Sequence, residues 1–286
     1  MLKTFIKKYT ILLLSLFLYA FLIICEQQQC RTVFVHGLGR NKEQLAYYIN
    51  SDYIENNAYS FNFCNDFLKI SLGQINEINA LMGNLENRLH SYDDNNDDGD
   101  IVLWGVSMGA ATIINFLASI DVNYRIDMIK GLILESPFAH VQDVINGKIS
   151  CNKWLTRLSY IPYATELIVK MKYPAHSLHG IQPIKCIHSI PKHIPVLFIA
   201  IEDDKIVPFA STIQLYKALI KVGHKKCHLL TLKQGEHGRL SKNEKQEHIL
   251  GIVHAFRKFY NLGNYSEAWA QTGWENFLNN TQPIFE

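Results

Sequence analysis

The chain has 286 residues, of which 48% are hydrophobic and 19% are charged, and its formal net charge is +2. A chain of this length and apolar content can bury one large core, as single α/β domains do. The charges are nearly balanced and form no concentrated basic run, so we expect no nucleic-acid partner.

The N-terminus carries a targeting or anchoring segment. Three lysines between Lys3 and Lys8 precede an apolar run at 9–25, which ends before Glu26. This run is long for the apolar part of a signal peptide and short for a membrane-spanning helix. We expect residues 1–29 to anchor the protein in the membrane, or to be cleaved. The lysines stay cytoplasmic in either case, so the rest of the chain is expected to be exported and then membrane-anchored, secreted or periplasmic.

Strand and helix patterns alternate from residue 31 onward. Strands are predicted at 31–35, 58–64, 101–104, 129–134, 195–201 and 228–232. Helices are predicted at 43–50, 75–89, 110–118, 211–222 and 243–260. Several strands are apolar throughout and are separated by helices. This pattern indicates an α/β protein with a mostly parallel sheet and helices on both faces.

The acidic segment 92–100, YDDNNDDGD, resembles the first half of a calcium loop that begins at Asp94. The Glu that closes such a loop is replaced by Gly105, so a solvated turn is the preferred interpretation. No cysteine and histidine spacing is typical of zinc, and we expect no metal or other cofactor.

The six cysteines suggest two disulfides in an exported protein. Cys30 and Cys64 lie at the edges of two neighbouring predicted strands, and Cys151 and Cys186 bracket one insert. The sequence does not fix this connectivity.

Residues 101–111, IVLWGVSMGAA, join an apolar strand to a helix through a very tight turn. The pattern from Gly105 to Gly109, with Ser107 at its centre, is that of a nucleophile elbow. Such a turn is strained and brings backbone segments close together, so glycine on both sides removes side chains that would clash. The first amides of the following helix point to the same place, where they can hold a developing negative charge. Ser107 is therefore the candidate nucleophile.

A serine nucleophile needs a base and an orienting acid, and candidates for both follow predicted strands. Asp204 comes just after the fifth strand and His237 just after the sixth, at the sheet edge where α/β proteins build their sites. Asp203 and Glu135 are alternative acids, because each also follows a strand. Four other histidines, His224, His228, His248 and His254, are expected on the surface or on helix faces. His36 is expected to have a structural role in shaping the oxyanion loop.

The order of these motifs resembles that of the α/β-hydrolase family, especially its serine-aminopeptidase-like and acyl-hydrolase branches. The matching motifs are HGLG at 36–39, GVSMGAA at 105–111, LILESPF at 132–138, DDKIVP at 203–208 and GEHG at 235–238. The first strand pair of the family is missing or shortened here.

The resemblance implies a role for each candidate residue. Ser107 would attack the substrate carbonyl, His237 would take and return the proton, and Asp204 would orient the imidazole. The backbone amides of Leu38 and Met108 would form the oxyanion hole.

The hydrolase domain is expected to span 30–263 and to be followed by a tail at 264–286 that can dock as a short helix. The alternation of strands and helices stops at 138–193, where we expect a mostly helical cap over the strand ends. The expected function is that of a serine hydrolase acting on small-molecule acyl esters or thioesters. A serine peptidase of the aminopeptidase type, a non-catalytic scaffold that acts as a binding module, and a lyase or haloperoxidase remain alternatives, because one fold serves many chemistries.

Overall fold

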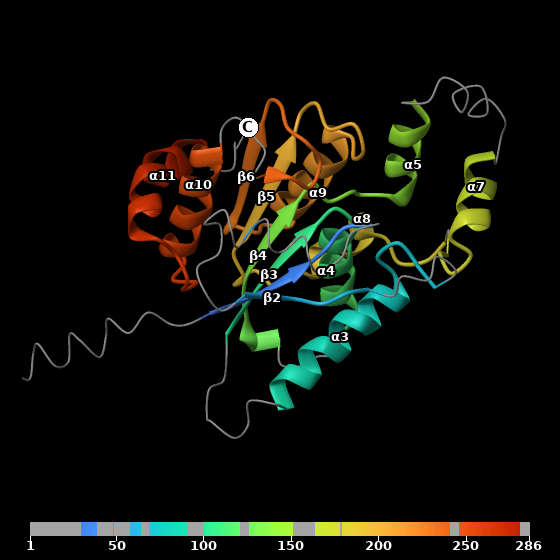
Figure 1. Ribbon diagram of the computed structural model, residues 1–286, viewed down its shortest axis with the longest axis horizontal. Helices are drawn as coiled ribbons and strands as arrows, with labels where there is room; N and C mark the ends of the chain where they lie inside the picture. Colours follow the sequence, from blue (N-terminus) through green and yellow to red (C-terminus); the bar gives the residue numbers. More distant parts are fainter. Residues whose placement is uncertain are drawn as a thin grey trace, which may run out of the picture.

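A six-stranded, wholly parallel sheet forms the centre of the protein in a computed structural model (Figure 1). The structure describes residues 30–38, 48, 58–63, 69–90, 100–120, 126–150, 164–177, 179–240 and 246–280. The strands are β1 (Arg31–Val35), β2 (Ala58–Ser60), β3 (Ile101–Val106), β4 (Ile129–Glu135), β5 (Val196–Ile201) and β6 (Cys227–Leu232). Their order across the sheet is β2-β1-β3-β4-β5-β6. The predicted parallel sheet is confirmed.

Helices cover both faces of this sheet. They are α3 (Ile75–His90), α4 (Met108–Ser119), α5 (Val141–Ser150), α7 (Ala164–Lys172), α8 (Pro183–Cys186), α9 (Phe209–Lys221), α10 (Gln246–Phe259) and α11 (Glu267–Asn280). Side chains of α3, α4, α8 and α9 join one core cluster with the sheet, and those of α10 and α11 join a second cluster. Figure 1 shows α10 and α11 together on the opposite side of the sheet from α4.

The central strands are buried along their whole length because they have helices above and below them. All six residues of β3 and all six of β5 are buried, which explains why these strands carry no polar alternation. Most predicted elements agree with the structure to within a few residues. β2 is shorter than predicted, and of the predicted helix 43–50 only Tyr48 is described.

The segment predicted as a cap divides into two parts. α5 and α7 stand beside the carboxyl ends of the strands, away from the main body (Figure 1). The segment from α8 to Ile194 packs on the core instead, with Cys186, Ile187, Ile190 and Ile194 in the buried cluster. The Ile184 amide donates to the Ala139 carbonyl at 3.2 Å. The segment is therefore helical, but its last part supports the sheet rather than covering the site.

The tail forms a longer helix than expected, because α11 packs closely along α10. A Cβ on Gly273 of α11 would lie 1.9 Å from the carbonyl carbon of Gly251 in α10, so only glycine allows this approach. Phe277 is buried in the core cluster shared with α10. Docking of the tail by a helix is thus observed.

The two suggested disulfides are wrong. Cys30, Cys186 and Cys227 are free thiols, and all three are buried. Cys30 directly precedes β1 and Cys186 is the last residue of α8, and each belongs to one of the two core clusters. Burial raises the pKa of the Cys30 thiol to about 11 and also raises that of Cys186.

Two of the sequence interpretations fall on residues that the structure does not describe. These are the apolar segment at 1–29 and the acidic loop from Asp94 to Gly99. Among the described helices, none combines the length and apolar character needed to cross a bilayer. Export of the chain stays a prediction.

Candidate active site

Ser107 lies on a strained turn between β3 and α4, as the G-x-S-x-G pattern predicts. Its φ of 55° and ψ of −114° lie outside the regions favoured by residues with a side chain. A Cβ on Gly105 would lie 2.5 Å from Ala110 Cα, and one on Gly109 would lie 2.0 Å from the Val35 carbonyl oxygen. The two glycines therefore make room for α4 and for β1 respectively, rather than for one another.

His237 and Asp204 form a hydrogen-bonded pair beside this turn. His237 Nδ1 donates to Asp204 Oδ2 at 2.6 Å, and the Asp204 side chain is only 1% exposed. The other oxygen, Oδ1, accepts the amides of Ile206 at 2.8 Å and Val207 at 3.0 Å. Burial would raise the pKa of Asp204, but the hydrogen bond and charge of His237 and the two amides outweigh burial and lower it. Asp204 is thus held as a carboxylate with its second oxygen aimed at the histidine.

The two alternative acids have other partners. Asp203 Oδ1 accepts the backbone amide of Gly235 at 3.1 Å, so it holds the loop that carries His237. Glu135 is fully buried and accepts the Tyr48 hydroxyl at 2.6 Å. Burial raises the pKa of Glu135 to about 8, so it is neutral at pH 7 and cannot stabilise an imidazolium.

The histidine of the HGLG motif has the structural role expected for it. His36 Nδ1 lies 2.8 Å from the Gly37 carbonyl oxygen, and its Nε2 accepts the Phe63 amide at 3.1 Å. Burial lowers the pKa of His36, which keeps it neutral, with the proton on Nδ1. These bonds fix the loop that carries Leu38 at the end of β1.

The other histidines that the structure describes do not line the cavity at Ser107. His224 and His228 are buried rather than at the surface, and His254 lies on helix α10, as expected, but is buried there. His228 bonds the Tyr260 hydroxyl at 2.6 Å, and His254 accepts the Ser266 amide at 3.1 Å. His237 is therefore the histidine that the fold places at the nucleophile.

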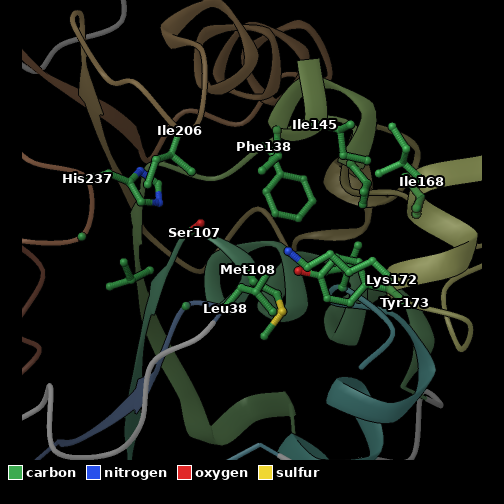
Figure 2. Close-up of a pocket in the computed structure, with 17 residues that line it drawn as sticks. Leu38, Ser107, Met108, Phe138, Ile145, Ile168, Lys172, Tyr173, Ile206 and His237 are labelled. Carbon is green, nitrogen blue, oxygen red and sulfur yellow. The ribbon is translucent and has the colours of Figure 1, made fainter. Parts of the chain in front are cut away.

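A cavity of about 230 Å³ opens at Ser107 (Figure 2). Leu38, Met108 and His237 line it together with Ser107, so the structure brings these four predicted residues to one place, with Asp204 directly behind the histidine. Figure 2 shows the Ser107 hydroxyl and the His237 imidazole turned toward each other. The arrangement can activate a serine hydroxyl and present it to a carbonyl group.

The cap helices supply the rest of the cavity wall, and the sequence did not single out these residues. Most of them are apolar, for example Val141 and Ile145 on α5 and Ile168 on α7. The apolar face of each short helix was a usable signal, but the sequence alone does not say which face meets the site. Among the described residues, no group of His, Cys, Asp or Glu is arranged to hold a metal ion.

The sheet order, the strained serine turn and the loops after β5 and β6 define an α/β-hydrolase. Residues 95–261 match the prolyl oligopeptidase family, and the chain belongs to that family. It is a serine hydrolase of the α/β-hydrolase type, which confirms the resemblance inferred from the motifs. No curated protein sequence matches the chain.

Solved structures show the same fold at low identity. The esterase Pf2001 of Pyrococcus furiosus is 18% identical with a TM-score of 0.58, over 82% of this chain and 85% of that one. The acylaminoacyl peptidase of Pyrococcus horikoshii is 17% identical with a TM-score of 0.55, over 84% of this chain but 38% of that one. Est1E of Butyrivibrio proteoclasticus is 16% identical with a TM-score of 0.52, over 82% and 89%.

Proposed function

We propose that this protein hydrolyses acyl esters or thioesters of small molecules through a covalent acyl-enzyme, with Ser107, His237 and Asp204 as its catalytic triad. The observation that carries the proposal is the 2.6 Å hydrogen bond from His237 to a buried carboxylate, beside a serine on a strained elbow. All three groups follow the carboxyl ends of parallel strands, β3, β5 and β6, at the sheet edge where α/β proteins place their sites.

The reaction then proceeds in two balanced halves. His237 removes the Ser107 proton as Oγ attacks the carbonyl carbon, and it gives that proton to the alcohol or thiol as the C–O or C–S bond breaks. Water then attacks the acyl-serine with His237 again as base, which releases the carboxylic acid and returns the proton to Ser107. Asp204 keeps the imidazole tautomer with Nδ1 protonated and stabilises its cation.

The oxyanion hole in this proposal consists of the Leu38 and Met108 amides. Met108 is the first residue of α4, so its N–H has no acceptor within that helix. Leu38 follows the loop that His36 holds, and both residues line the cavity at Ser107. Each donor is expected to contribute about 3 kcal/mol to stabilising the tetrahedral intermediate.

The character of the cavity favours acyl groups over free peptide N-termini. The described lining residues are mostly apolar and include no Asp or Glu, whereas an aminopeptidase needs an acid to hold the substrate amine. Membership of the prolyl oligopeptidase family supports peptide-bond cleavage as the second candidate. Matched assays with an acyl ester and the corresponding acyl amide of a dipeptide separate the two.

The test is labelling of the protein with a fluorophosphonate probe. We expect the wild type to be labelled and Ser107→Ala and His237→Ala to be unlabelled. Ser119→Ala, which changes an exposed serine on α4, is the matched control and should be labelled as the wild type is. A folded wild type that is not labelled would favour the binding-module alternative, and equal labelling of Ser107→Ala would refute the assignment of the nucleophile.

A further inference from the structure

The cavity at Ser107 carries two polar groups on the side away from His237. These are the ammonium of Lys172, the last residue of α7, and the hydroxyl of Tyr173, which follows it. Figure 2 shows the tips of both side chains close to one another, pointing into the cavity beneath Phe138. Lys172 is the only Lys or Arg among the described lining residues, so it brings the cationic group to this side of the cavity, although the residue as a whole is exposed.

The charge of Lys172 is not neutralised by a carboxylate in the described part of the chain, where no ion pair involves it. Lys172 Nζ lies over the ring of Tyr173, 5.6 Å from the ring centroid. Tyr173 is buried, and burial raises the pKa of its hydroxyl. The phenol therefore remains a hydrogen-bond donor beside the ammonium at neutral pH.

The position of this pair relative to the sheet is fixed by hydrogen bonds. The Tyr173 amide donates to the Val169 carbonyl at 2.7 Å, so the residue continues the last turn of α7. The buried Gln74 side chain then holds the following segment. It accepts the Ser177 amide at 2.8 Å and donates to the carbonyls of Ser177 at 2.8 Å and Ile181 at 3.0 Å. The pair is thus part of a built wall and not the tip of a loose loop.

We propose that Lys172 and Tyr173 determine substrate specificity by binding a carboxylate at the far end of the acyl group. The substrates would then be esters or thioesters in which one carboxyl of a dicarboxylic acid is esterified and the other is free. An ammonium and a phenol can both donate charge-assisted hydrogen bonds to a carboxylate. In a partly apolar surrounding these bonds are stronger than in water. This inference rests on the proposed hydrolase function and deepens it.

The geometry places the carboxylate on the acyl side of the scissile bond. The leaving group must lie next to His237, because the imidazole protonates it. Lys172 and Tyr173 lie on the other side of Ser107 in Figure 2, which is where the acyl chain extends once its carbonyl is at the serine. A volume of about 230 Å³ has room for roughly seven or eight groups of the size of a water molecule, which suits a short or medium chain.

The test compares 4-nitrophenyl hydrogen adipate, which has a free carboxylate, with 4-nitrophenyl hexanoate, which has the same chain length and no charge. The quantity measured is the ratio of kcat/KM for the first ester to kcat/KM for the second. The variants are Lys172→Met and Tyr173→Phe. Lys170→Met is the matched control, because Lys170 is exposed on the same helix and does not line the cavity.

We expect Lys172→Met to lower the ratio about tenfold or more and Tyr173→Phe to lower it several-fold, while Lys170→Met leaves it as in the wild type. The wild-type ratio should also fall as ionic strength rises. A ratio that Lys172→Met leaves unchanged, with both esters hydrolysed, overturns this inference alone. Loss of activity in the wild type toward both esters overturns the proposed function and this inference with it.

Discussion

Replacing the buried acid Glu135 by Gln should make the stability of the protein less dependent on pH. Glu135 is fully buried, and burial raises its pKa from 4.5 to about 8 against the lowering effect of the Tyr48 hydrogen bond, while the charge of Asp204 raises it further. Between these two values the folded state keeps a proton that the unfolded state gives up. The free energy of unfolding therefore falls as pH rises, by about 1.4 kcal/mol for each unit of pH.

The magnitude follows from that interval. Between pH 5 and pH 8 the wild type should lose about 3 kcal/mol more stability than Glu135→Gln, because the glutamine amide keeps the shape and does not ionise.

Urea denaturation at four pH values across this range, followed by tryptophan fluorescence, measures the difference. Other titrating groups, such as the buried His36 and His224, cancel when the variant is subtracted from the wild type. Glu86→Gln, at an exposed position of α3, is the control. A difference that does not change with pH, or that changes in the opposite direction, would refute the neutral state of Glu135.

Three further changes probe the elbow and the acid. Gly109→Ala should destabilise the fold by about 3 kcal/mol in urea denaturation, since its Cβ would lie 2.0 Å from the Val35 oxygen; a loss below about 0.5 kcal/mol contradicts this. Ser107→Gly should be about 1 kcal/mol more stable than Ser107→Ala, because φ is 55° there, and equal stabilities would argue against strain. Asp204→Asn should reduce kcat for ester hydrolysis roughly ten-thousand-fold, whereas a loss below tenfold would give another residue its role beside His237.

The elbow and the histidine–aspartate pair could be predicted because each depends on local sequence. A tight strand-to-helix turn needs glycine at Gly105 and Gly109 for steric reasons, and that requirement is visible in five residues. His237 and Asp204 follow apolar strands, and parallel strands bring their carboxyl ends to one edge. The chain order of these features was therefore enough to place them around one site.

The cap and the cysteines could not be predicted in the same way, because their positions depend on tertiary packing. The sequence shows that α7 has an apolar face but not that Lys172, at its end, lies across the cavity from His237. Likewise, Cys30 and Cys186 lie at ends of elements, as a disulfide would require, yet packing buries both as thiols. The close approach of α11 to α10 at Gly273 is also set by long-range packing.

The choice between the two acids, Asp204 and Glu135, shows how environment assigns chemistry that sequence leaves open. Glu135 ends β4 and Asp204 follows β5, but the fold keeps the first acid neutral and the second ionised. Asp204 receives two backbone amides and the imidazole, which lower its pKa despite burial. For Glu135 the effect of complete burial outweighs that of its side-chain partners Tyr48 and Trp104, and its pKa rises. The charge of Asp204 itself contributes to that rise. Of these two acids, therefore, only Asp204 is charged, and it is the one that the imidazole contacts, which is the charge distribution that a serine–histidine–acid mechanism requires.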